Sequence, residues 1–361
     1  MERARRVAEI EKKPRTPGRE RLLNPLLIRR LDKFTSNRRA YRALLVFLVL
    51  FVISLFAELI ANDKPLLIRF EGRFYVPLFR EYTEKNFGGD SEIVAHYHDP
   101  WVAGLITDSG WMIWPVIRYS FDTVDFYLDV PAPAPPSWKH WLGTDDQGHD
   151  VAALIIYGFR MSVIFGLVLT VVSSAVGIAV GAVQGFYGGL LDLLFQRFIE
   201  MWASLPSLYL IIIITSVIQP TFGLLLLVLL LFRWITLEGV VRAEFLRVRN
   251  FEFVKAARAL GVSNFTIIFR HILPNAMVST LTFLPFILNG SIVALTSLDF
   301  LGLGLPAGHP SLGRLLAQGK ANLQAPWLGF TSFVVLSVML SLLLFIGEGV
   351  RDAFDPRREA G

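Results

Sequence analysis

The stretch Val254-Lys-Ala-Ala-Arg-Ala-Leu-Gly-Val-Ser-Asn-Phe-Thr-Ile-Ile-Phe-Arg-His-Ile-Leu-Pro274 is a mixed polar segment between strongly apolar parts of the chain. Small or apolar residues recur in its first part at helical spacing: Phe253, Ala256, Ala257 and Leu260. A soluble helical segment in such surroundings is typical of a part on which another protein acts. The sequence therefore predicts an exposed helical loop that a partner contacts.

Two short helices are expected within this loop, separated by a glycine. Asn250 is placed to cap the first helix, because its side-chain oxygen can accept an amide of the first turn. Gly261 is expected to end this helix, since glycine adopts a left-handed conformation without strain. Ser263 or Asn264 can cap the second helix, and Pro274, which lacks an amide donor, is expected to stop it.

The composition indicates a membrane protein rather than two soluble domains. Hydrophobic residues make up 53% of the 361 residues. The segment Ala43–Ala61 is long enough, at about 1.5 Å per residue, to cross a hydrocarbon core of roughly 30 Å. Further apolar stretches run over 161–183, 193–219, 222–241, 276–297 and 327–347. The sequence therefore predicts an all-α polytopic membrane protein with six transmembrane helices.

Lysine and arginine are concentrated in particular flanks of these apolar stretches. Residues 1–42 hold 14 Lys or Arg against 5 Asp or Glu, the 242–275 loop holds 6 against 2, and residues 62–157 hold 7 against 14. Because basic flanks stay in the cytoplasm, both termini are predicted to be cytoplasmic. The net charge of +5 is thus a topology signal, and no nucleic acid is expected as a partner.

Residues 62–157 form the longest polar stretch and hold five of the eight tryptophans. The runs Leu66–Phe70 and Arg73–Val76 predict a small β-containing element. Four prolines between residues 131 and 136 predict a stiff, extended connection to the next apolar segment. We therefore expect a folded extracytoplasmic insertion, which no disulfide stabilises because the chain has no cysteine.

The helical loop resembles the EAA loop of ABC-importer permeases, in which Glu-Ala-Ala, three residues, Gly and nine further residues precede Ile-x-Leu-Pro. The matching positions are Ala256, Ala257, Gly261, Leu273 and Pro274, with Lys255 where Glu is usual and His271 where Ile is usual. The ending, which begins at Arg270, is similar to that of the dipeptide and oligopeptide branch. The resemblance implies that these eight residues belong to a loop that couples the permease to an ATPase.

Two other segments carry the same resemblance. Leu142-Gly-Thr-Asp145, followed by Gly148 and Asp150, resembles the Leu-Gly-Thr-Asp-x-x-Gly-Arg-Asp signature of peptide permeases, with His149 where Arg is usual. Gln184–Gly189 is similar to a glycine-rich cytoplasmic turn of that family. The three motifs occur in the family's order along the chain, which makes the resemblance specific.

The resemblance implies a type I ABC-importer fold in the bacterial inner membrane. It implies a heterodimer with a second permease subunit, two ATP-binding domains on the cytoplasmic loops, and a periplasmic binding protein that delivers a peptide substrate. ATP and Mg are then used by the ATPase subunits, and this chain binds no cofactor and contacts only partners, peptide and membrane lipid. The long insertion, Glu58–Leu66 and Leu323–Leu328 are similar to the branch that takes up the peptide-nucleotide antibiotic microcin C in enterobacteria.

Five parts of the chain follow from these expectations. They are a cytoplasmic arm (1–42), a first transmembrane helix (43–61), an extracytoplasmic insertion (62–157), a permease core with five transmembrane helices (158–350) and a cytoplasmic tail (351–361). The core includes the cytoplasmic coupling loop 242–275.

Asp145, Arg197 and Glu200 are candidate polar residues of the transport path. The Asp145 carboxylate can instead hold a local turn by accepting amides two or three residues further on. Arg197 and Glu200 are neighbours on a helix face, so they either pair structurally or line the path. Arg233 lies deeper in an apolar stretch, without an evident partner and with snorkelling as an alternative.

Other chemistry finds little support in the sequence. His96 and His98 can share one side of a strand, but no second cluster completes a metal site, so no metal is expected. Catalytic signatures such as Gly-x-Ser-x-Gly and His-Glu-x-x-His are absent, which argues against an enzyme. A proton-coupled secondary transporter is the alternative function, with Glu200 and Glu238 as the only candidate carboxylates within the membrane.

Overall fold

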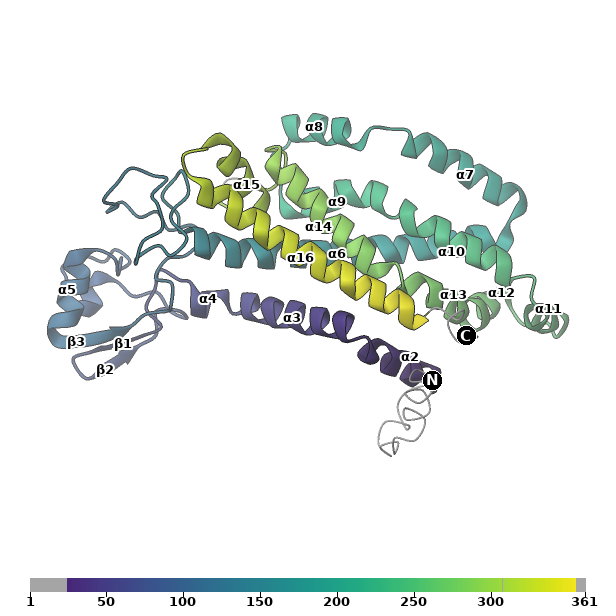
Figure 1. Ribbon diagram of the computed structural model, residues 1–361, viewed down its shortest axis with the longest axis horizontal. Helices are drawn as coiled ribbons and strands as arrows, with labels where there is room; N and C mark the ends of the chain where they lie inside the picture. Colours follow the sequence, from purple (N-terminus) through teal and green to yellow (C-terminus); the bar gives the residue numbers. More distant parts are fainter. Residues whose placement is uncertain (1–24, 307, 355–361) are drawn as a thin grey trace, which may run out of the picture.

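The computed structural model describes residues 25–306 and 308–354. Figure 1 shows an elongated molecule whose long helices run roughly along one axis. A small sheet lies at one end of this axis, and the short helices of the 250–275 segment lie at the other. The first 24 residues of the predicted arm and residues 355–361 of the predicted tail lie outside the described residues.

Most of the described chain is α-helical, as the apolar composition predicts. The first half contains α2 (Pro25–Ser36), α3 (Arg38–Leu55), α4 (Ala57–Ile60), α5 (Pro100–Ser109), α6 (Val151–Tyr187), α7 (Gly189–Ala203), α8 (Ser207–Val217), α9 (Phe222–Arg233) and α10 (Ile235–Val248). The second half contains α11 (Glu252–Ala259), α12 (Asn264–Thr266), the π-helix η2 (Ile267–Ile272), α13 (Leu273–Leu281), α14 (Leu284–Phe300), α15 (Leu312–Ala321) and α16 (Pro326–Phe354). The helical class is confirmed.

Three stretches are long and apolar enough to cross a membrane without a sharp bend: 151–187, 222–248 and 326–354. Two bent pairs meet the same condition, since α7 and α8 meet at 65° and the helices on either side of residues 282–283 meet at 56°. Prolines explain both bends, because Pro206 precedes α8 and Pro285 lies in the first turn of α14. The described residues thus hold up to five spans by length and composition.

The remaining predicted span is the first along the chain, Ala43–Ala61. It corresponds to α3 and α4, which meet at Phe56. Its helix is shorter than the apolar stretch and starts among the arginines that precede residue 43. Its inner end nevertheless packs closely in the bundle, because a Cβ at Gly349 of α16 would overlap that of Ala40. The count of six transmembrane helices stays a prediction.

The insertion contains a three-stranded antiparallel sheet in the order β2-β1-β3. Its strands are β1 (Leu67–Phe70), β2 (Arg73–Tyr75) and β3 (Gly110–Ile113). Ile68 of β1 lies opposite Tyr75 of β2, so the predicted β element is confirmed. Buried Ile68, Phe87, Val102 and Ile106 join the sheet to α5 and the 3-10 helix η1 (Glu84–Phe87) in one small core.

A close contact joins α6 to α10 and depends on a row of glycines four residues apart. A Cβ at Gly177 would lie 2.6 Å from the Trp234 carbonyl oxygen, and one at Gly181 would lie 2.6 Å from the Glu238 carbonyl oxygen. Gly185 is equally tight against the last turns of α10. Small residues at this spacing let two membrane helices approach until their backbones touch.

Gly181→Leu is expected to separate α6 from α10, because its side chain has no room beside the backbone of α10. We expect a loss of about 1–3 kcal/mol or more in the stability of the folded protein, measured as thermal unfolding in detergent. Gly239→Leu is the matched control, because a Cβ at Gly239 on α10 meets no atom within 4 Å. Equal unfolding temperatures for the two variants would contradict the close contact.

Candidate functional site

The helix pair of the 250–275 segment exposes large apolar side chains at the end of the molecule opposite the sheet. Phe253 and Leu260 are 43% and 82% exposed, and Phe265 and Phe269 are 69% and 53% exposed. The rings of Phe265 and Phe269 lie 4.4 Å apart between centroids. Aromatic residues exposed together in this way are typical of a protein contact surface.

The opposite side of the helix pair is buried against the ends of two long helices. Val254 and Ala257 of α11 and Ile267 and Ile272 of η2 are buried in one cluster. The cluster also contains four residues from the C-terminal ends of α6 and α10: Ala182, Phe186, Phe245 and Val248. Because this contact is apolar and close-packed, the helix pair is attached to α6 and α10 rather than hanging from a flexible loop.

Two sequence predictions for the helix pair are confirmed. Gly261 has φ +73° and follows the last turn of α11, so it ends this helix in the left-handed region. A Cβ at Gly261 would meet no atom within 4 Å, so backbone conformation rather than space favours glycine here. Ser263 caps the second helix, since its Oγ accepts the Thr266 amide at 3.3 Å.

Two further predictions are wrong. Asn250 does not cap α11, because α10 runs on to Val248 and the Asn250 side chain donates back to the Leu246 carbonyl oxygen at 3.1 Å. Pro274 does not stop the second helix, which continues through η2 into α13. In η2 the Leu273 amide donates to Ile268, five residues back, and Pro274 then lies in the first turn of α13, where no amide donor is needed.

The predicted coupling residues divide into an exposed and a buried set. Lys255, Ala256, Gly261, Arg270 and Pro274 are exposed, whereas Ala257 is buried and His271 and Leu273 are half-buried. The Lys255 ammonium lies 2.8 Å from the Glu252 carboxylate, and both side chains remain largely in solvent. The exposed set is available to a partner, and the buried set attaches the helix pair to the bundle.

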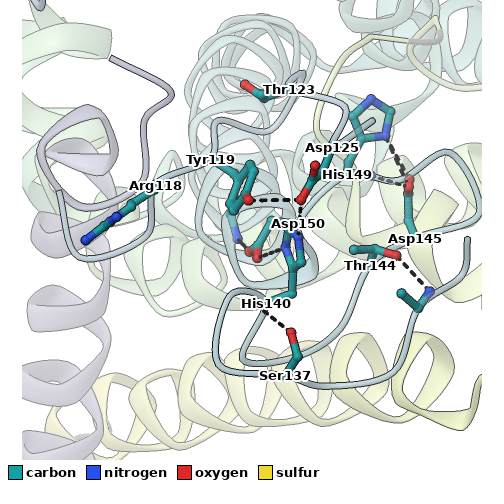
Figure 2. A network of polar contacts seen from close by, with 12 residues as sticks. Arg118, Tyr119, Thr123, Asp125, Ser137, His140, Thr144, Asp145, His149 and Asp150 are labelled. Carbon is teal, nitrogen blue, oxygen red and sulfur yellow. Dashed lines mark hydrogen bonds and ion pairs between the residues drawn. The ribbon is translucent and has the colours of Figure 1, made fainter. Parts of the chain in front are cut away.

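A buried polar network lies between the insertion and the start of α6 (Figure 2). Nδ1 of His140 is 2.8 Å from Asp150, and its Nε2 is 3.1 Å from Asp125. The Tyr119 hydroxyl donates to the same Asp125 oxygen at 2.9 Å. Asp150 also caps α6 by accepting the Ala153 amide. His140 therefore joins a carboxylate of the insertion to a carboxylate at the first turn of a membrane helix.

This arrangement favours the imidazolium form of His140, because both ring nitrogens face carboxylate oxygens and must donate. Burial alone would lower the pKa of His140, but the hydrogen bonds to Asp150 and Asp125 outweigh it and raise the pKa above the usual value. Burial likewise opposes ionisation of Asp125, yet bonds from the Tyr127 amide, His140 and Tyr119 lower the pKa of Asp125. The network is thus complete in a pH window between these two pKa values.

Asp145 holds a local turn, which is one of the two roles that the sequence left open for it. Its Oδ1 accepts the Gln147 and His149 amides at 2.9 and 2.8 Å. Its Oδ2 accepts from Gln318 of α15 at 3.1 Å and lies 3.1 Å from Nδ1 of His149. Burial opposes the charge, but the bonds from His149 lower the pKa of Asp145. Every carboxylate oxygen of Asp145 is therefore bonded within the chain.

Arg197 and Glu200 form an exposed pair on α7, with the guanidinium 2.6 Å from the carboxylate. His96 is exposed, and Nε2 of His98 lies 2.6 Å from the Arg118 carbonyl oxygen, so the two histidines do not converge. Within residues 25–306 and 308–354, no group of three or more His, Cys, Asp or Glu side chains is arranged to hold a metal ion.

The sequence reading missed a polar cluster between α6, α7 and α10. Asp192 accepts two bonds from Arg242, one of them at 2.7 Å from Nη2. Gln196 donates to Gln184 of α6 at 3.0 Å and to buried Glu238 of α10 at 3.2 Å. The sequence held a signal for this cluster, since each residue is polar and lies within or at the edge of an apolar stretch. Which of them would meet depended on how α7 folds back along α6 and α10.

Comparison with known proteins gives a consistent result. Residues 177–360 match the family described as "Binding-protein-dependent transport system inner membrane component". "Inner membrane ABC transporter permease protein YejE" of Escherichia coli strain K12 is 57% identical over 336 residues, which is 93% of this chain and 98% of that protein.

Two further relatives extend the comparison. "Peptidoglycan transport system permease protein YejE" of Agrobacterium fabrum is 53% identical over 96% of each chain. "Oligopeptide transport system permease protein OppC" of Mycobacterium tuberculosis strain H37Rv is 35% identical over 257 residues, which is 70% of this chain and 87% of that protein.

His140→Gln is expected to loosen the outer network more at about pH 5.5 than at about pH 9. The raised pKa of His140 means that its charged form stabilises the fold fully below its usual pKa of 6.5, and this contribution is lost as pH rises through the folded value. Hydrogen exchange of residues 119–150 measures the difference, with His96→Gln, on an exposed side chain, as control. An effect of His140→Gln that is the same at both pH values would contradict the ionised network.

Proposed function

The chain belongs to the family of binding-protein-dependent transport system inner membrane components, and from this premise we propose that it is the permease subunit of an ATP-driven importer of peptides. It has the all-α type I importer permease fold of that family and is a multi-pass inner-membrane protein. Support for a peptide cargo comes from the oligopeptide permease that is 35% identical over 70% of the chain. Peptide conjugates of the microcin C type fall within this proposal.

The observation that carries the proposal is the helix pair at 252–272. Its apolar face is fixed to α6 and α10, and its other face exposes Phe253, Leu260, Phe265 and Phe269. A surface of this kind can receive a push from a partner and pass it to the membrane helices as a rigid-body movement. The residues that we assign to the coupling loop are Lys255, Ala256, Ala257, Gly261, Arg270, His271, Leu273 and Pro274, and Ala257, His271 and Leu273 among them attach it to the bundle.

The proposal includes the partners of this subunit. A second permease completes the path, two ATP-binding domains contact the helix pair, and a periplasmic binding protein delivers the peptide on the side of the insertion. ATP hydrolysis with Mg takes place in the partner domains, and this chain binds no cofactor. Both termini are cytoplasmic, in keeping with the position of α2 and the end of α16 at the end of the molecule opposite the sheet (Figure 1).

The five parts inferred from the sequence are retained within this proposal, with 62–157 as the outer insertion and 242–275 as the coupling loop. Asp145, Arg197 and Glu200 take structural roles in it, because each of them is bonded within the chain. A path-lining role for these three residues has no specific support in the geometry.

Uptake by the reconstituted complex tests the proposal directly. Proteoliposomes contain this chain, the second permease and the ATP-binding domains, with binding protein and labelled peptide on the outer side. We expect uptake that requires ATP and continues when a protonophore abolishes the proton gradient. Uptake driven by the gradient without ATP would instead support a proton-coupled secondary transporter, for which buried Glu238 is the candidate carboxylate.

A substitution at Gly261 tests whether the helix pair is the coupling part in the same assay. Gly261→Val places a β-branched residue at φ +73°, a conformation that costs about 1–2 kcal/mol for a residue with a Cβ. We expect normal amounts in the membrane but reduced ATP-driven uptake. Gly261→Asn is the control, because asparagine tolerates this conformation better and should retain most uptake.

A further inference from the structure

Arg233 carries its charge at mid-depth in a membrane-spanning stretch. It is the twelfth residue of the stretch Phe222–Val248, so its Cα lies roughly 16 Å from the outer end at about 1.5 Å per residue. Gly290, which it contacts, lies ten residues before Phe300 at the outer end of α14, or roughly 15 Å. Both helices thus place the contact near the middle of a hydrocarbon core of roughly 30 Å.

The guanidinium of Arg233 is held sideways against α14 and does not extend to a membrane surface. Its Nη2 donates to the Gly290 carbonyl oxygen at 2.7 Å. A Cβ at position 290 would lie 3.1 Å from Nη1, so the glycine makes room for the guanidinium. The sequence left snorkelling open, and this contact argues against it. A single bond to a neutral carbonyl fixes the position of the guanidinium but does not neutralise its charge.

The charge of Arg233 has no counter-ion in the described part of the chain. No carboxylate among residues 25–306 and 308–354 pairs with Arg233, whereas Arg242 on the same span is paired with Asp192. An arginine at the centre of a bilayer costs about 2.5–3.5 kcal/mol even on the most permissive scale, so such residues face water or an anion. The side chain is half-buried, which leaves part of it open beside the bundle.

The span continues past Arg233 without a sharp bend, because Trp234 between α9 and α10 keeps helical dihedral angles and its carbonyl oxygen accepts the Glu238 amide at 3.1 Å. A fixed guanidinium with free N–H groups matches a carboxylate, which it can bind through two parallel hydrogen bonds. The depth of Arg233, its fixed position and its missing counter-ion therefore point to a carboxylate as the ligand.

We propose that Arg233 lines the translocation path and binds the C-terminal carboxylate of the peptide as it crosses the membrane. The inference rests on the proposed function and adds a specificity-determining residue to it. Every unmodified peptide carries this carboxylate whatever its side chains, so one arginine can serve many sequences. A peptide with a C-terminal amide has the same size but lacks the charge.

The test compares uptake of one peptide as the free acid and as the C-terminal amide in the reconstituted complex at saturating binding protein. The binding protein is identical in all samples, so the ratio of variant to unsubstituted uptake for each peptide reports on the membrane part. Arg233→Gln is expected to lower uptake of the free acid about tenfold, as the loss of a charge-assisted contact predicts. Uptake of the amide should change less than about twofold.

Two matched variants complete the design. Arg233→Lys keeps the charge and should retain the preference for the free acid, and Arg39→Gln removes one exposed charge from the cytoplasmic flank and should leave both rates unchanged. Equal losses for acid and amide in Arg233→Gln would overturn the inference, as would a failure of both Arg233 variants to assemble with the second permease. If the complex with the unsubstituted chain took up neither peptide in the presence of ATP, this result would contradict the proposed function instead.

Discussion

The contact of α6 with α10 is the constraint on which the rest of the structure depends. In a membrane, lipid is as apolar as the helix surface, so close packing rather than the hydrophobic effect holds helices together. Gly177, Gly181 and Gly185 supply this packing in the last three turns of α6. At the C-terminal ends of α6 and α10 the same contact continues into the apolar cluster beneath α11 and η2. The helix pair is therefore an extension of a rigid two-helix unit.

The other end of α6 is held by charged groups as well as by apolar packing. Asp150 caps its first turn and also faces His140, which in turn faces Asp125 of the insertion. Gln318 of α15 joins the neighbouring turn through Asp145 and Asp146. One helix of 37 residues, about 55 Å long, thus connects the insertion with the helix pair. A force applied at either end reaches the other through a single continuous element.

Much of this organisation could be predicted from the sequence because membranes simplify the problem. Apolar length, basic flanks and the spacing up to Gly261 were sufficient for the helical class and for the exposed helix pair. Prediction failed where one residue type fits two different positions at a helix end. The Asn250 side chain bonds to the last turn of α10 instead of capping α11. Pro274 is accommodated by a π-helix, for which the sequence has no local signal.

Contacts between distant residues were beyond the sequence for a different reason. His140 lies 15 residues from Asp125, and Arg233 lies 57 residues from Gly290. Arg233 and Gly290 meet because two long helices pack in one particular register, and His140 meets Asp125 because two irregular segments of the insertion fold against each other. No local sequence pattern specifies either contact. The glycine row on α6 could have been noticed, since glycines at this spacing are a known signal of close helix approach. The sequence alone does not show which helix packs against this glycine row.

The central claim is that the helix pair at 252–272 moves as one body with α6. The distance between two spin labels, at Leu260 directly after α11 and at Val171 of α6, tests this claim. Both side chains are exposed, at 82% and 66%, and the chain has no native cysteine. The account predicts the same distance distribution in the nucleotide-free complex and in the ATP-bound, closed complex. A shift of about one helical turn, ~5 Å, or a broad distribution in either state would show that the pair moves independently and would contradict the account.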